Sequence, residues 1–87
     1  MVVDSLPARD PDLMMHALSD PTRRDIVAAV LGVEHSVSSL ARRYPMSFAA
    51  VQKHVAVLET AQLVSKRRQG REQLVRGNVD TIRAARA

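Results

Sequence analysis

The sequence has no cysteine and no tryptophan, and only one tyrosine and one phenylalanine occur among its 87 residues. Without thiols the chain can form neither a disulfide nor a cysteine-based zinc site. A domain of this size buries only about 60% of the surface that its unfolded chain exposes, so pairing with a second copy is the remaining source of extra burial. The hydrophobic content of 46% is too high for a disordered chain.

Long apolar runs are also absent. The longest run, residues 26–33, is far shorter than the roughly 20 residues of a membrane-spanning helix. Residues 1–7 lack the basic start and the apolar centre of a secretory signal. The sequence contains no set of nucleophile, base and orienting group, and no glycine-rich phosphate loop. We therefore expect a soluble, cytoplasmic protein that is not an enzyme and needs no cofactor.

Charge is distributed unevenly along the chain. Residues 1–37 carry three bases and six acids, and residues 38–87 carry ten bases and three acids, so their net charges are −3 and +7. A basic half joined to a mildly acidic half predicts one surface that faces a polyanion and another that serves a different contact.

The spacing of apolar residues predicts four helices, of which the first covers residues 10–18. Asp10-Pro11 and Asp20-Pro21 each place an aspartate at an N-cap and a proline at the first helical position. Gly32 ends the second helix, and residues 34–36 are expected to be a loop. Ser38 is predicted to cap a short third helix and Ser47 to cap a fourth, whose core side would hold Phe48, Val51, Val55 and Leu58.

After the fourth helix the period changes to that of strands. Residues 63–68 and 72–76 read as two strands joined by a turn at residues 69–71, and residues 79–87 are weakly helical. The predicted fold class is therefore mainly α with a small β-hairpin. The chain would form a single domain over residues 1–87, with a helix-turn-helix at 37–60 around a turn at 44–46 and a wing at 63–77.

The outer face of the fourth helix is the first candidate for function. Placing residues at 100° intervals puts Ala49, Ala50, Lys53 and Ala56 on this face and Gln52 at its boundary. Alanine can contact a thymine methyl group, and glutamine can pair with adenine. A solvated face built from good helix formers is the alternative, but the absence of acids between residues 47 and 57 favours an anionic partner.

The hairpin is the second candidate. Residues 66–76 hold five bases and one acid, a net charge of +4. A basic hairpin after a helix-turn-helix is typical of a wing that reaches the minor groove or its phosphates. The alternative is an edge hairpin whose charges prevent aggregation, although that protection does not require a single sign.

A metal site receives little support from the three histidines. His16 and Asp12 lie one helical turn apart, but an isolated pair is more typical of a surface or an interface. His35 has no neighbouring ligand, and His54 lies at the edge of the core face, where packing or a phosphate contact is expected. We therefore expect no metal site.

Three segments together resemble a known family, the bacterial ArsR-type winged helix-turn-helix repressors. Residues 18–27 (LSDPTRRDIV) resemble its L-x-D-P-T-R-R-x-I-L signature, and residues 46–59 (MSFAAVQKHVAVLE) resemble its recognition helix. Residues 61–64 and 67–72 resemble its wing. The resemblance covers residues 12–80 and implies a homodimeric repressor that binds palindromic double-stranded DNA and dimerises through its first and last helices.

The residue pattern and the family resemblance together predict a set of DNA-contact and dimer residues. Bases would be read by Ala49, Ala50, Gln52 and Lys53. The phosphates and the minor groove would be contacted by Ser38, Ser39, Arg42, Ser47, His54, Arg67, Arg68 and Arg71. The helices at 10–18 and 79–87 would form the dimer through Leu13, Met14, Leu18, Val79 and Ile82.

Departures from the family pattern refine these expectations. Residues 36–43 contain no thiol and residues 79–87 offer only Asp80, so sensing of metal or arsenic is not expected. Gln62 stands where the family has glycine, which predicts a strained turn between helix and strand. The last helix is short, so either dimerisation relies on the first helix or the chain is a shortened form of a longer parent.

Two other functions stay open at this point. A winged-helix module could bind a protein instead of DNA, since fold does not determine function. A metal-responsive repressor could use His16 and Asp12.

Overall fold

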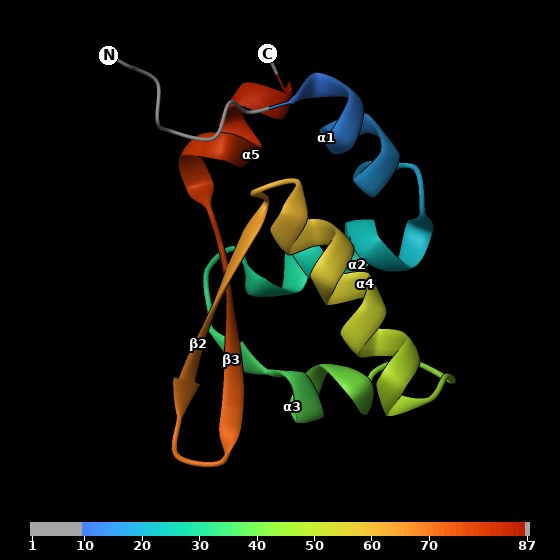
Figure 1. Ribbon diagram of the computed structural model, residues 1–87, viewed down its shortest axis with the longest axis vertical. Helices are drawn as coiled ribbons and strands as arrows, with labels where there is room; N and C mark the ends of the chain where they lie inside the picture. The colour runs from blue at the N-terminus through green and yellow to red at the C-terminus, as the bar shows by residue number, and fades with distance from the viewer. Residues whose placement is uncertain (1–9, 87) are drawn as a thin grey trace.

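Five helices and a three-stranded antiparallel sheet make up residues 10–86, the part of the chain that this computed structural model describes (Figure 1). The predicted domain also includes residues 1–9 and 87, and the predicted last helix also includes residue 87. These residues lie outside the described part. The elements in chain order are α1 (Pro11–Leu18), α2 (Pro21–Val30), β1 (His35–Ser36), α3 (Val37–Ala41), α4 (Phe48–Thr60), β2 (Val64–Gln69), β3 (Glu72–Gly77) and α5 (Val79–Arg86).

Side-chain caps begin the first four helices. The carboxylates of Asp10 and Asp20 accept the backbone N–H groups of Asp12 and Arg23, both at 2.9 Å, as the Asp-Pro pairs predict. Ser47 caps α4, also as predicted, by accepting from the Ala50 N–H at 3.1 Å.

The prediction of Ser38 as the cap of α3 is wrong. Ser36 occupies the N-cap and accepts from the Ser39 N–H at 3.0 Å. The reason is backbone geometry: Ser36 is extended at φ −73° and ψ 155°, as a cap requires, whereas Ser38 already lies within the helix. The connection from α3 to α4 is also longer than the predicted turn at 44–46, because α3 ends at Ala41 and α4 begins at Phe48.

The sheet contains a strand that the sequence pattern did not predict. Residues 34–36 were expected to be a loop, but His35 and Ser36 pair with Val75 and Leu74 of β3, giving the order β1-β3-β2. Two residues are too few for an alternating pattern to be visible in a sequence. The hairpin turn is also one residue shorter than predicted, because β2 continues to Gln69. Gly70 in the turn has a φ of 62°.

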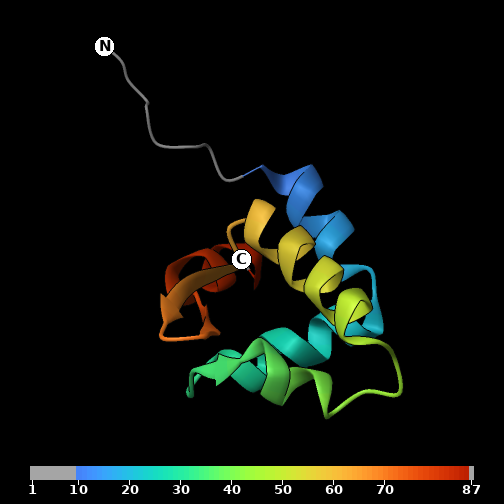
Figure 2. The same cartoon turned by 60° about the horizontal axis from the view of Figure 1, so that its bottom comes forward.

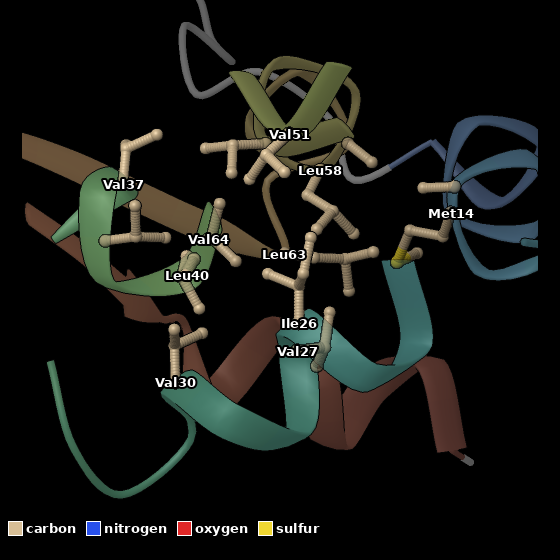
Figure 3. Packing of buried hydrophobic residues seen from close by; sticks show 14 residues of the cluster. Met14, Ile26, Val27, Val30, Val37, Leu40, Val51, Leu58, Leu63 and Val64 are labelled. Carbon is tan, nitrogen blue, oxygen red and sulfur yellow. The ribbon is translucent and has the colours of Figure 1, made fainter. Parts of the chain in front are cut away.

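The core lies between α4 and the layer formed by α2, α3 and the sheet (Figure 3). Val51, Val55 and Leu58 of α4 are buried there, as predicted. Phe48 was expected on the same face but is 47% exposed. As the first residue of α4, it lies at the end of the helix that is farthest from the hairpin (Figure 1).

The strained turn that the family resemblance predicted follows α4. Gln62 has a φ of 63°, in the left-handed region that favours glycine. Asn78 braces this turn: its side chain donates to the Gln62 carbonyl at 2.9 Å and accepts from the Ser65 hydroxyl at 2.8 Å. The Asn78 N–H also donates to the Leu63 carbonyl at 2.9 Å. These bonds fasten the base of the hairpin to the end of α4 and the start of α5.

Candidate functional site

The exposed face of α4 consists of short side chains and one cation. Ala49, Gln52, Lys53 and Ala56 are exposed, whereas Ala50 is half-buried. The expected positions of Ala50 and Gln52 are therefore interchanged, with Gln52 on the exposed face. Within residues 10–86, Lys53 forms no ion pair. This face could thus approach an anionic surface closely, with one amide and one ammonium group available for polar contacts.

The residues that precede this face are held by α2. The Tyr44 hydroxyl donates to the Asp25 carboxylate at 2.7 Å, and an Arg43 nitrogen lies 3.9 Å from the same oxygen. Burial, and then the bond to Asp25, raise the pKa of Tyr44 above its usual value. Ser38 of α3 and Arg42, the C-cap of α3, are exposed, whereas Ser39 of α3 is half-buried, so two of these three predicted contact residues face solvent.

The cations of the hairpin differ in their availability. Arg67 donates two hydrogen bonds to the Glu34 carboxylate, at 2.8 and 2.9 Å, and this contact lowers the pKa of Glu34. Lys66 lies 3.2 Å from the Glu59 carboxylate at the end of α4. Arg68 and Arg71 are exposed and have no ion-pair partner among the described residues. The net charge of +4 for residues 66–76 therefore overstates the number of hairpin cations that could contact a partner, because Lys66 and Arg67 are already paired with acids outside the hairpin.

Helix α4 lies beside the hairpin (Figure 2). A small polar cleft lies between the two elements. It has a volume of about 80 Å³, and its polar lining comes from Gln52, Lys66 and Gln73. Gln73 was not among the predicted site residues. Its register could have identified it, because it pairs with Arg68 and lies two residues before the buried Val75.

His54 lies on the opposite flank of α4, toward α1 and α2. Its Nδ1 accepts a hydrogen bond from Arg23 Nη1 at 3.2 Å. The structure therefore separates His54 from the hairpin, although the two were expected to contact the same partner.

The predicted dimer residues have unequal exposure. Leu13 and Val79 are 40% and 43% exposed, and Leu18 and Ile82 are half-buried. Met14 is only 8% exposed and points into the core (Figure 3), so it cannot present its side chain to a second copy without a rearrangement. Its neighbour Met15 is 72% exposed and was not in the predicted set of dimer residues. The 100° helical step could have revealed this, because Met14 and Ala17 share the inner side.

No group of three or more histidine, cysteine, aspartate or glutamate residues suited to a metal ion occurs within residues 10–86. In the same range no helix is long and apolar enough to cross a membrane.

Residues 20–66 match the sequence profile of bacterial regulatory proteins of the arsR family. The chain is 45% identical over 62 residues to the HTH-type transcriptional regulator Rv2034 of Mycobacterium tuberculosis, covering 71% of this chain and 58% of the relative. The chain thus spans about 58% of the length of this curated relative.

Solved structures share the fold. An ArsR-like transcriptional regulator from Rhodococcus sp. RHA1 is 33% identical and superposes with a TM-score of 0.77, over 87% of this chain and 72% of that chain. The homodimeric winged helix-turn-helix DNA-binding domain of Mb0332 from Mycobacterium bovis is 24% identical, with a TM-score of 0.77 over 86% of this chain and 70% of that chain.

Proposed function

Since the chain belongs to the ArsR family of bacterial regulatory proteins, we propose that it binds a palindromic DNA operator as a homodimer and represses transcription in the cytoplasm. The family resemblance seen in the sequence is confirmed, as is the prediction of a winged helix-turn-helix regulator and not an enzyme. The domain assignment stays a proposal: one domain over residues 1–87, with the helix-turn-helix at 37–60 and the wing at 63–77.

The exposed face of α4 is the observation that carries this proposal. A helix that enters the major groove needs an outer surface without acids and with side chains short enough to reach base edges. Ala49, Gln52 and Lys53 meet this requirement, and their helix is braced from behind by Val51, Val55 and Leu58. We assign base contacts to these three exposed residues, with Ala50 beside them.

Phosphate contacts follow from the free cations and the exposed donors around this face. Ser38, Arg42 and Ser47 lie before or at the start of α4, and Arg68 and Arg71 lie on the hairpin. Arg67 would need to exchange Glu34 for a phosphate, so its share of the binding free energy is smaller than that of Arg71. Ser39 contributes its backbone to the start of α3.

The dimer is proposed to form through α1 and α5. Both helices lie at the end of the molecule opposite the hairpin tip (Figure 1). They expose Leu13, Met15 and Val79, and Leu18 and Ile82 line an adjacent apolar groove of about 240 Å³. A two-fold axis there would place the two copies of α4 about 34 Å apart, one turn of DNA.

Selection of bound fragments from random duplex DNA tests this proposal. We expect enrichment of an inverted repeat and an affinity that falls steeply with salt, because phosphate contacts release counterions. Purified protein that selects no sequence, and that fails to shift promoter DNA at low salt, would contradict the proposal. That result would favour a winged-helix module that binds a protein partner.

A further inference from the structure

Arg23 joins three helices through a single side chain. Its Nε donates to the Ala17 carbonyl at 2.8 Å, and its Nη2 donates to the His16 carbonyl at 3.1 Å. Both acceptors lie in the last turn of α1, where helix carbonyls have no partner within the helix. The His16 carbonyl also accepts from the N–H and the hydroxyl of Ser19, the C-cap residue. The remaining nitrogen, Nη1, reaches His54 of α4 at 3.2 Å.

The backbone of Arg23 is fixed as well. Its N–H donates to the Asp20 carboxylate, and this bond lowers the pKa of Asp20. The backbone at Arg23 is therefore anchored at the start of α2, and its side chain connects the end of α1 to α4.

This contact determines the proton arrangement on His54. A guanidinium group only donates hydrogen bonds, so Nδ1 of His54 must accept and carry no proton. In the neutral ring the proton then resides on Nε2. A protonated Nδ1 would be a donor that faces another donor, so the link exists only with this tautomer.

The position of His54 on α4 means that the bond to Arg23 holds the flank of the helix opposite the hairpin. His54 lies between the buried Val51 and Val55 in sequence and is itself half-buried. Gln52 and Glu59, on the other flank, face the hairpin through the small cleft and the ion pair with Lys66. Helix α4 is thus held on one flank by the wing and on the other flank by Arg23.

We propose that Arg23 and His54 form a latch that sets the orientation of α4 relative to α1, the helix proposed to dimerise. His54 is then a positioning residue that acts through Nδ1 toward Arg23, and not a phosphate contact. The latch rests on the proposed DNA-binding function, because its purpose is to keep the two copies of α4 at the spacing of the operator.

Two substitutions of His54 separate these roles. In His54→Asn the amide oxygen can take the place of Nδ1, whereas in His54→Gln the longer amide takes the place of Nε2. We expect His54→Asn to keep operator affinity within about twofold and His54→Gln to weaken it about tenfold, the effect of about one hydrogen bond at each of two copies. The probe is the inverted repeat selected from random DNA.

Arg24 provides the matched control for Arg23. It is the next residue on α2, and it also donates to a carbonyl of α1, that of Leu18 at 2.7 Å, but it does not reach α4. We expect Arg23→Gln to weaken operator binding about tenfold and Arg24→Gln to change it by less than about threefold. Equal losses in the two variants, or a loss in His54→Asn that His54→Gln does not show, would overturn the latch.

A measurement without DNA keeps the latch testable if the proposed function fails. The ¹⁵N resonances of the imidazole ring report its tautomer, and we expect His54 to be the Nε2–H form in the wild type and a mixture in Arg23→Gln. A wild-type His54 in the Nδ1–H form, or a tautomer unchanged by Arg23→Gln, would refute the link directly. Failure of the DNA selection alone would leave this result unaffected.

Discussion

Glu34 neutralises Arg67, the arginine of β2 that lies across from it on the outer face of the sheet. Both carboxylate oxygens are used, at 2.8 and 2.9 Å from the guanidinium nitrogens. Glu34 directly precedes β1, which pairs with β3, so the contact ties the loop before the sheet to the far strand. The wing is therefore fixed at its outer side by an ion pair whose cation would otherwise be available to DNA.

The first prediction concerns the acid dependence of stability. Contact with Arg67 depresses the pKa of Glu34 below its ordinary value of 4.5. A group with a depressed pKa stabilises the fold above its unfolded-state pKa and loses that contribution as the pH falls through its folded-state pKa. We expect Glu34→Gln to lower the thermal midpoint at neutral pH and to match the wild type in strong acid. A difference that persists unchanged in strong acid would contradict this prediction, and circular dichroism melts across the pH range measure it.

The second prediction concerns the salt dependence of DNA binding. Arg71 is exposed and unpaired among residues 10–86, so Arg71→Ala should reduce the slope of log affinity against log salt by about 1. Arg67→Ala is the matched control from the same hairpin, and it should change the slope less, because Glu34 already compensates its charge. Fluorescence anisotropy titrations at several salt concentrations give both slopes. Equal changes of slope in the two variants would show that the ion pair with Glu34 does not keep Arg67 from contacting DNA.

The third prediction concerns specificity. Gln52 is exposed on the outer face of α4, and a glutamine paired with a base distinguishes it from a wrong base by about 1–3 kcal/mol. Gln52→Ala should therefore relax preference at one operator position and leave the others unchanged. Competition binding with single-base operator variants measures this. A uniform loss across all variants would mean that Gln52 does not read a base.

The fourth prediction concerns the strained turn at Gln62. A non-glycine residue in the left-handed region costs about 1–2 kcal/mol relative to glycine. We expect Gln62→Gly to be more stable than Gln62→Ala by about 1 kcal/mol, because both lose the side chain and only alanine keeps the strain. Urea denaturation of the two variants provides the comparison. Equal stabilities would mean that the φ of 63° carries no strain.

The fifth prediction concerns the dimer. Met15 is 72% exposed on α1, so Met15→Lys should raise the dimer dissociation constant about tenfold while leaving the monomer fold intact. Val33→Lys, in the loop after α2, is a control at another exposed apolar residue. Sedimentation equilibrium distinguishes the two. A dimer that tolerates Met15→Lys as well as Val33→Lys would exclude α1 around Met15 from the interface.

Local chemistry made much of this fold predictable from the sequence. The Asp-Pro pairs and Ser47 identified three helix starts, because a cap and a first-turn proline act within a few residues. The strain at Gln62 could be predicted only through the family resemblance, because the family has glycine at this position. The apolar spacing of α4 likewise gave its buried side correctly.

Features that depend on distant partners were not predictable in the same way. The strand at His35 exists only because β3 offers it a partner 40 residues later in the register with Val75. The pairing of Glu34 with Arg67 and that of Arg23 with His54 join residues 33 and 31 positions apart, so the order of residues in the sequence did not show that they pair. The prediction that Phe48 is buried was wrong because a helical wheel shows which side of a helix faces the core, but not how far along the helix the core extends.

Asn78 gives the hairpin the mechanics of a cantilever. Its bonds to Gln62, Leu63 and Ser65 clamp one end of the beam, whereas the other end is a two-residue turn at Gly70 and Arg71. Deflection of such a beam grows with distance from the clamp, so the tip can follow variations in groove width while the base holds its register. Operators that differ in local shape could then be accommodated by bending of residues 68–73, the part of the hairpin beyond the ion pairs of Lys66 and Arg67.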